Sequence, residues 1–115
     1  MKYKRGDIAL VLFPDSNLQT AKRRPVLVLQ ADNLDTRLNQ TIVAMVTSSL
    51  IRANHPSRVS DILSTPEGKA SGLLLDSVIM TDNIVTISHL AFDRKIGVWK
   101  NMSEVETALR HTLDI

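Results

Sequence analysis

The chain has 115 residues, with 14 Lys and Arg against 12 Asp and Glu and no cysteine. This length suits one domain built on one hydrophobic core, so we expect a single domain over residues 1–115. A composition of 43% hydrophobic and 23% charged residues excludes a disordered chain, a collagen and a coiled coil. The absence of cysteine excludes disulfides, thiolate catalysis and cysteine zinc sites.

The net charge of +2 is unevenly distributed along the chain. Residues 1–60 carry 9 Lys and Arg against 4 Asp and Glu, whereas residues 61–115 carry 5 against 8. A basic first half indicates a polyanionic partner. Only Tyr3, Phe13, Phe92 and Trp99 are aromatic, too few to fill a core and also stack bases. A nucleic acid would therefore be held mainly by arginine, lysine and hydroxyl groups.

A short apolar run at residues 8–13 follows the charged N-terminus. It is too short for a signal-peptide core or a membrane span, and it precedes no cleavage site. Together with the absence of cysteine, this favours a cytoplasmic protein.

Short apolar runs separated by turn residues predict strands through most of the chain. The predicted strands cover residues 8–13, 25–30, 41–47, 58–63, 73–80, 84–88 and 96–99. Residues 64–68 and 92–95 are predicted turns, and residues 81–83 either separate two strands or form a kink. Closely spaced strands of this kind indicate a small antiparallel barrel, since closing a sheet hides its edges.

The last segment has helical periodicity instead. Ser103 and Glu106 have the spacing of a capping box, in which each side chain satisfies an unpaired amide of the first turn. Apolar side chains then recur at helical spacing. The pattern predicts an amphipathic helix over residues 104–113 that packs on the sheet.

The first candidate site is the basic run Lys22, Arg23 and Arg24, followed by Pro25. A guanidinium pairs bidentately with phosphate and can stabilise charge that develops on a phosphoryl oxygen. The alternative is a solvated strand end that keeps the protein soluble.

Two further candidates lie in or after apolar strands. Thr47 and Ser48 end a predicted strand, where hydroxyls bind phosphate or cap the next turn. Asp82 lies in an apolar segment, where a carboxylate pairs with an arginine, acts as a base or forms a turn with Asn83.

His55 lies in a polar loop between Arg52 and Arg58 and could reach a polyanion. The other histidines are His89, after an apolar strand, and His111, on the predicted helix. None has metal-ligand spacing, and no nucleotide-binding glycine motif is present, so we expect no cofactor.

The order and spacing of these segments resemble the MazF/PemK toxins of bacterial type II toxin–antitoxin systems over roughly residues 4–113. The matching segments are Arg5-Gly6-Asp7-Ile8, Arg24-Pro25 with the strand that follows, residues 43–48, Gly72-Leu73 with Ser77-Val78, and Ile96-Gly97 before the helix.

The resemblance implies a mainly β fold, an SH3-like barrel of antiparallel strands with a C-terminal helix. It implies a homodimer, a partner antitoxin protein, and a metal-independent endoribonuclease that cuts single-stranded messenger RNA. In that reaction the 2′-hydroxyl attacks phosphorus and leaves a 2′,3′-cyclic phosphate and a 5′-hydroxyl. The alternatives are a CcdB-like gyrase-directed toxin on the same barrel and a non-catalytic barrel that binds nucleic acid or protein.

Carried over residue by residue, the resemblance makes Arg24 the group that binds phosphate and stabilises charge, and a candidate general acid. It makes Thr47 the group that orients phosphate. Asp82 falls on the family's acidic position and is a candidate base, although Met80 and Val85 stand where many members carry arginine. Lys22, Arg23, Ser48, Arg52, His55 and Arg58 are expected to line one RNA groove.

Overall fold

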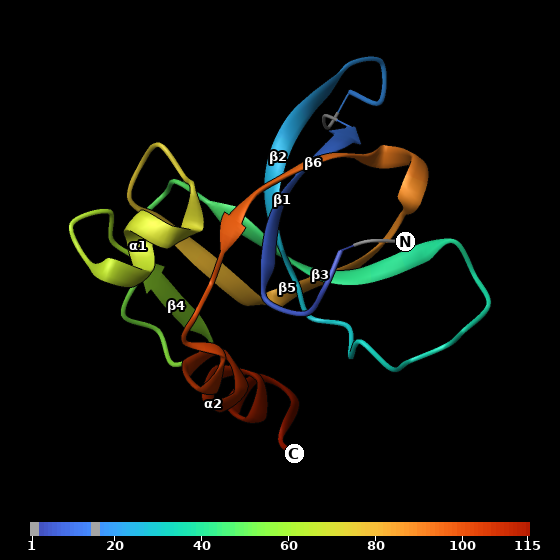
Figure 1. Cartoon of the computed structure of the whole chain (residues 1–115). Helices are drawn as coiled ribbons and strands as arrows, with labels where there is room; N and C mark the ends of the chain where they lie inside the picture. The colour runs from blue at the N-terminus through green and yellow to red at the C-terminus, as the bar shows by residue number, and fades with distance from the viewer. Residues whose placement is uncertain (1–2, 15–16) are drawn as a thin grey trace.

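Six strands form one antiparallel sheet, and two α-helices pack against it (Figure 1). The computed structural model describes residues 3–14 and 17–115. The elements in chain order are β1 (Asp7–Pro14), β2 (Ala21–Val28), β3 (Gln40–Thr47), β4 (Arg58–Asp61), α1 (Pro66–Ser71), β5 (Ser77–Ser88), a 3-10 turn η1 (His89–Ala91), β6 (Phe92–Val98) and α2 (Met102–Leu113). The sheet order is β4-β5-β3-β2-β1-β6. The predicted class, mainly β with a C-terminal helix, is confirmed. Within the described residues no helix is long and apolar enough to cross a membrane.

The central strands contain continuous apolar runs, such as Val26–Val28 of β2, because both faces of the curled sheet are buried there. Successive side chains of a strand point to opposite faces, so neighbours in sequence enter different cores. The first core lies under α2 and includes Ile8, Leu27, Ala44, Trp99 and Val105, and the second lies on the other face and includes Ala9, Val11, Val26, Val43 and Met45.

Helix α1 packs between the two edge strands, β4 and β6, which are not paired with each other. A Cβ on Gly68 would lie 1.9 Å from the carbonyl oxygen of Ile62, and one on Gly72 would lie 1.9 Å from that of Ile96. Only glycine lets the backbones approach this closely. The edges are therefore protected by a helix seated between them rather than by full closure of the barrel.

The N-terminal segment is bound to the C-terminal part of the chain. The Trp99 amide donates to the Gly6 carbonyl at 2.8 Å, and Arg5 Nη2 donates to Glu106 Oε2 at 2.9 Å. Because Glu106 pairs with Arg5, it does not complete a capping box with Ser103. The N-cap of α2 is Asn101, whose side chain accepts from the Glu104 amide, so the predicted capping box is wrong.

Three other local predictions also differ from the structure. The predicted turn at 64–68 starts α1, which Thr65 caps by accepting from the Gly68 amide at 3.0 Å. The predicted turn at 92–95 is part of β6, an edge strand with exposed charged side chains. Strand β5 begins at Ser77 rather than residue 73 and runs through residues 81–83, which form the kink.

Candidate active site

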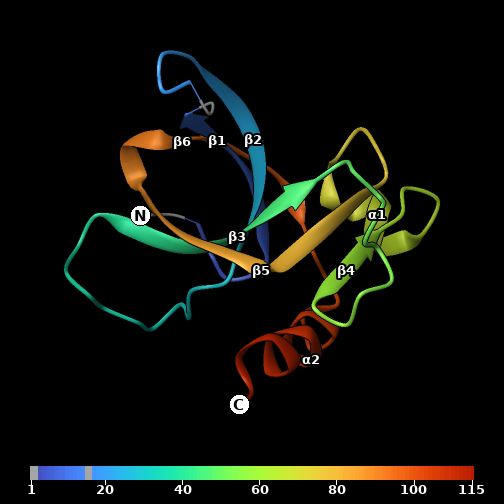
Figure 2. The ribbon, with the colours of Figure 1, turned by 180° about the vertical axis from the view of Figure 1, so that it is seen from behind.

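An opening forms where β2 and β3 separate. The two strands pair only over Val26–Val28 and Val43–Met45. Pro25, the residue before this ladder, has no backbone N–H to contribute to it. The first half of β2 pairs with β1 alone, and the two strands project as an arm from the sheet (Figures 1 and 2). The side chains that would have faced each other across β2 and β3 instead border a cavity.

This cavity has a volume of about 640 Å³. It receives side chains from the β1–β2 arm, the end of β3, the segment 72–77, β5 and β6. Three arginines, Arg23, Arg24 and Arg94, and the hydroxyls of Thr47, Ser48 and Ser77 line it together with apolar groups. Such a set of cations and hydroxyls suits a phosphate group, with apolar surface beside it for a base or sugar.

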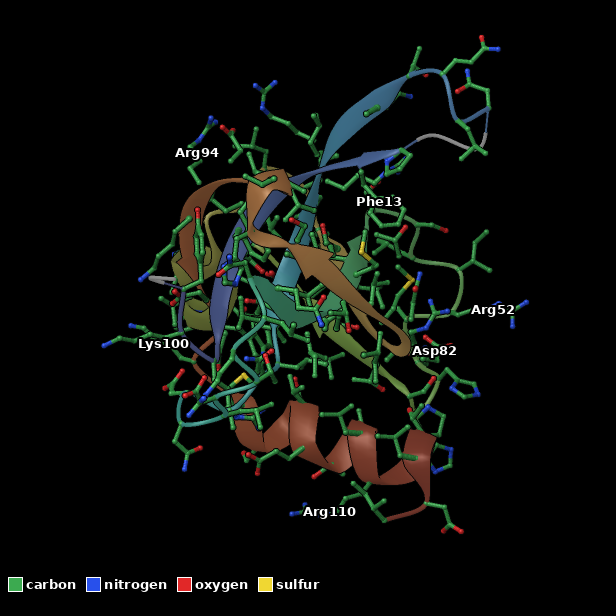
Figure 3. All side chains as sticks on the ribbon, turned by 90° about the vertical axis from the view of Figure 1, so that its right-hand side faces the viewer. Phe13, Arg52, Asp82, Arg94, Lys100 and Arg110 are labelled. Carbon is green, nitrogen blue, oxygen red and sulfur yellow. The ribbon has the colours of Figure 1, made fainter. Side chains whose placement is uncertain are left out.

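The rim of the cavity holds a shared carboxylate. Asp93 Oδ2 accepts from Arg23 Nε at 3.0 Å and from Arg94 Nη1 at 3.1 Å. One negative charge therefore holds two guanidinium groups side by side, and the pair keeps a net positive charge. Figure 3 shows Arg94 in the upper part of the molecule, to the left of the arm that β1 and β2 form.

Thr47 stands at the last position of β3, and its Oγ1 accepts from the Ser49 amide at 3.1 Å. The turn-capping role predicted for these hydroxyls is therefore present, and Thr47 also lines the cavity. The structure brings Arg24 and Thr47 together in one cavity, with Arg23 and Ser48 beside them.

Strand β5 carries a bulge at the edge of this cavity. Met80 is opposite Met45 and Ile84 is opposite Ala44, so the three residues between them have no partner on β3. Met80 and Asn83 line the cavity. Thr81 is buried beneath, and Asp82 is turned away. A bulge re-aims side chains in this way next to many functional sites.

Asp82 pairs with Arg58, one of the alternatives that the sequence left open. Arg58 Nε and Nη2 donate to its two carboxylate oxygens at 2.8 and 3.1 Å. Partial burial acts to raise the pKa of the Asp82 carboxyl, but the hydrogen bonds and charge of Arg58 outweigh it and hold that pKa below its usual value. Asp82 is not among the residues that line the cavity, and in Figure 3 it lies below Phe13, towards α2.

The remaining predicted RNA-binding residues lie outside the cavity lining. Lys22 is exposed on β2, opposite Phe13 of β1. Arg52 is exposed in the loop before β4 and projects outward in Figure 3. His55 Nδ1 accepts from the Ser57 amide at 3.1 Å, and its ring lies 6.1 Å from that of His111 on α2. His55 therefore faces the helix rather than Arg24.

The cavity also contains residues that the sequence does not predict as part of a site, among them Phe13, Ser77, Asn83 and Arg94. Arg94 was assigned to a turn and Asn83 to a kink, so neither was considered as part of a site. Within the described residues, no group of three or more His, Asp and Glu side chains could hold a metal ion.

The sequence pattern of the family described as PemK-like, MazF-like toxin of type II toxin–antitoxin system matches residues 4–113. Among curated proteins, the chain is 36% identical over 107 residues to Endoribonuclease MazF6 of Mycobacterium tuberculosis, covering 90% of each chain. It has the same identity and coverage with Endoribonuclease MazF2 of Mycobacterium bovis.

Solved structures share the fold. The toxin MazF-mt6 of Mycobacterium tuberculosis superposes with a TM-score of 0.70 and 23% identity, over 93% of this chain and 97% of that one. A mycobacterial endoribonuclease in complex with its cognate antitoxin gives a TM-score of 0.73 and 19% identity, over 98% and 96% of the two chains. A MazE–MazF structure from Deinococcus radiodurans superposes with a TM-score of 0.74 and 18% identity, over 100% of this chain and 99% of that one.

Proposed function

This chain belongs to the family of PemK-like and MazF-like toxins of type II toxin–antitoxin systems, and from that premise we propose that it is an endoribonuclease whose active site is the cavity between β2 and β3. The observation that carries the proposal is the meeting of Arg24 and Thr47 in that cavity. The substrate is single-stranded RNA, and the site of action is the cytoplasm, where messenger RNA is translated.

The reaction is an internal transfer at phosphorus. The 2′-hydroxyl loses its proton as its oxygen bonds to phosphorus, the bond from phosphorus to the 5′-oxygen breaks, and that oxygen takes up a proton, so the products are a 2′,3′-cyclic phosphate and a 5′-hydroxyl. Negative charge grows on the non-bridging phosphoryl oxygens, and Arg24 stabilises it with a rigid pair of donors. Thr47 and Ser48 hold the phosphate for attack by the 2′-oxygen.

Of the candidate residues that the resemblance implies, Arg23, Arg24, Thr47 and Ser48 share the cavity. Arg23, one of the RNA-binding residues expected from the sequence, and Arg94, which was not among them, are the cations beside Arg24 that would attract the RNA backbone, whereas Arg52 and Arg58 lie outside the cavity lining. Asp82 remains a candidate base only through a rearrangement that releases it from Arg58. We therefore assign catalysis to Arg24 and Thr47.

We also propose two protein partners, a second copy of this chain and an antitoxin. Leu74 and Leu75, at the margin of the cavity, are 91% and 63% exposed. Apolar side chains at this level of exposure beside a basic cavity suit an acidic, partly disordered segment that orders as it binds. Sedimentation of the purified chain, alone and after co-expression with the product of the adjacent gene, measures both associations.

The proposal is tested by incubating the chain with mixed-sequence RNA in EDTA. We expect cleavage products that end in 2′,3′-cyclic phosphate, and a rate at least about 100-fold lower for Arg24→Ala. Arg52→Ala, which removes an exposed cation outside the cavity, is the matched control and should retain the wild-type rate. No cleavage under any condition, together with trapping of DNA gyrase, would support the gyrase-directed alternative.

A further inference from the structure

The bulge in β5 presents three consecutive side chains in three different directions. Thr81 is fully buried, Asp82 pairs with Arg58, and Asn83 is exposed at the cavity. Two of the three side chains are thus engaged by the protein itself. In the part of the chain that the structure describes, the Asn83 side-chain amide makes no hydrogen bond, whereas the side chains of Thr81 and Asp82 do.

Thr81 anchors the bulge from beneath. Its backbone amide donates to the Ser57 carbonyl at 3.1 Å, and its Oγ1 lies 2.7 Å from Thr112 Oγ1 on α2. Thr112 in turn donates to the Ala108 carbonyl at 2.9 Å. The Thr81 hydroxyl also donates to the Ser57 carbonyl at 2.5 Å, so this side chain contacts both the loop before β4 and α2.

Asp82 anchors the bulge from the side, through two hydrogen bonds to Arg58 of the neighbouring strand β4. A carboxylate held by a guanidinium at two points has a fixed orientation as well as a favourable energy. The backbone on both sides of Asn83 is therefore restrained by pairing, with Ile84 opposite Ala44 on β3. A side chain that emerges from such a restrained position is preorganised for a ligand.

The chemistry of the cavity shows what Asn83 can add. The other polar side chains that line it are arginines and hydroxyls, which suit phosphate and sugar. Asn83 is the one side-chain amide among the described lining residues. An amide offers a donor and an acceptor side by side, the arrangement that reads the edge of an unstacked base.

We propose that Asn83 is a specificity-determining residue that reads one base next to the cleaved phosphate, and that the Thr81 and Asp82 contacts are what hold it in position. This inference rests on the proposed function and deepens it. The Asn83 amide is placed against a base edge, while Arg24 and Thr47 engage the phosphate. Its removal should change which sequences are cut more than how fast the best one is cut.

The test compares Asn83→Leu, which keeps the shape and removes hydrogen bonding, with Asn83→Asp, which keeps only acceptors. Each variant cleaves an RNA pool with randomised sequence, and the cut ends are sequenced. Thr86→Ala, on the same strand and outside the cavity lining, is the matched control.

We expect the wild-type preference at one position near the cut to fall about tenfold in Asn83→Leu, with the other positions unchanged. Asn83→Asp should shift the preference at that position towards adenine, cytosine and guanine over uracil, because their amino groups can donate to a carboxylate. Wild-type profiles from both variants, or an equal loss at every position, would overturn the proposal.

A second readout separates this inference from the proposed function. The same variants bind oligonucleotides that carry 2′-deoxy sugars, which cannot be cut, and that differ in one base. If wild-type protein cuts no RNA, the proposed function fails, while a base preference in binding that Asn83→Leu removes still supports Asn83 as a reader. Equal binding of all bases by the wild-type chain would overturn it.

Discussion

Arg58 and Asp82 face each other across β4 and β5 with two hydrogen bonds, of 2.8 and 3.1 Å. The Arg58 side chain is 15% exposed and that of Asp82 is 39% exposed. Asp82, which the resemblance makes a candidate base, here pairs with Arg58 and holds the bulge of β5. The same pair also removes Arg58 from the cations available to RNA.

The Asp82→Asn variant measures the role of this pair. Because Asp82 is turned from the cavity, we expect most of the cleavage rate to remain, with a loss of stability below about 1 kcal/mol. A pKa that is lowered in the folded state stabilises the protein above the ordinary carboxyl pKa, and that contribution is lost as the pH falls through the lower value. Urea unfolding at several acidic pH values checks this, and a cleavage rate like that of Arg24→Ala would show Asp82 to be catalytic.

Removal of the Asp93 carboxylate, which Arg23 and Arg94 share, should raise the affinity for RNA. Asp93→Asn removes the negative charge between Arg23 and Arg94, so both guanidinium groups become more available to phosphate. We expect tighter binding of a 2′-deoxy oligonucleotide and a steeper dependence on salt, by roughly 0.7 in the log–log slope for each additional phosphate contact. Fluorescence anisotropy across a salt series measures both quantities. Asp35→Asn in the β2–β3 loop is the control, and an unchanged slope in Asp93→Asn would contradict the expectation.

Asp61 predicts an unusual dependence of stability on pH. This side chain is fully buried at the end of β4, and neither carboxyl oxygen has a hydrogen-bond partner in the described structure. The Ser71 hydroxyl instead donates to the Gly68 carbonyl at 2.7 Å. Burial raises the pKa of the Asp61 carboxyl, and the nearby charge of Asp76 adds to this rise.

A carboxyl whose pKa is raised in the folded state stabilises the protein while it is protonated, and that contribution is lost as the pH rises through the folded-state pKa. We therefore expect Asp61→Asn to melt at a higher temperature than wild type at pH 8, with the gap closing towards pH 4. Thermal unfolding across this range is the measurement, with Asp114→Asn at the end of α2 as the control. Parallel curves for Asp61→Asn and wild type would contradict the assignment.

Gly72 lines the cavity and also packs against the backbone of Ile96 on the edge strand β6. It has a φ of +76° and approaches the Ile96 carbonyl too closely for any Cβ. Gly72→Ala combines backbone strain with a clash, so we expect a loss of at least about 2 kcal/mol in the free energy of unfolding. Gly6→Ala, which has a φ of +94° but no atom nearer than 3.5 Å, isolates the strain alone. Urea unfolding of both variants checks the difference, and equal losses would show that the clash is relieved.

Thr112 links α2 to the bulge through the Thr81 hydroxyl. Thr112→Val keeps the shape of the side chain and leaves the buried Thr81 hydroxyl without that partner. The expected loss of stability is about 1 kcal/mol. Thr107→Val makes the same change on the exposed face of α2 and should cost less. Unfolding curves in urea give both values, and a cost for Thr107→Val as large as that for Thr112→Val would contradict the role of the link.

Much of the fold could be predicted because its signals are local. The strands around Ile8, Val26 and Val43 are buried on both faces, so they appear as continuous apolar runs that turn residues interrupt. Helix α2 has a clear helical period. Helix α1 was missed because it has only six residues, although Thr65 and Pro66 are typical of a helix start.

The site could be predicted only where one short segment carries its chemistry, as at Arg24 and Thr47. Asn83 and Arg94 join it through strand register and a bulge, which depend on partners far away in the sequence. The Arg58–Asp82 pair is long-range for the same reason. A carboxylate next to an asparagine favours a turn by local chemistry, and here tertiary pairing extends the strand through it.

The pairing of β1 with β6 has a consequence for synthesis of the chain. These strands lie near opposite ends of the sequence, with Asp7 opposite Val98 and the Gly6 carbonyl bound to the Trp99 amide. Contacts of such long sequence separation form late and slowly. The first strand must wait for the last to leave the ribosome, and Arg94, which lines the cavity, arrives with it. A nascent toxin therefore carries an incomplete site until almost all of it has been translated, which delays any attack on the message that encodes it.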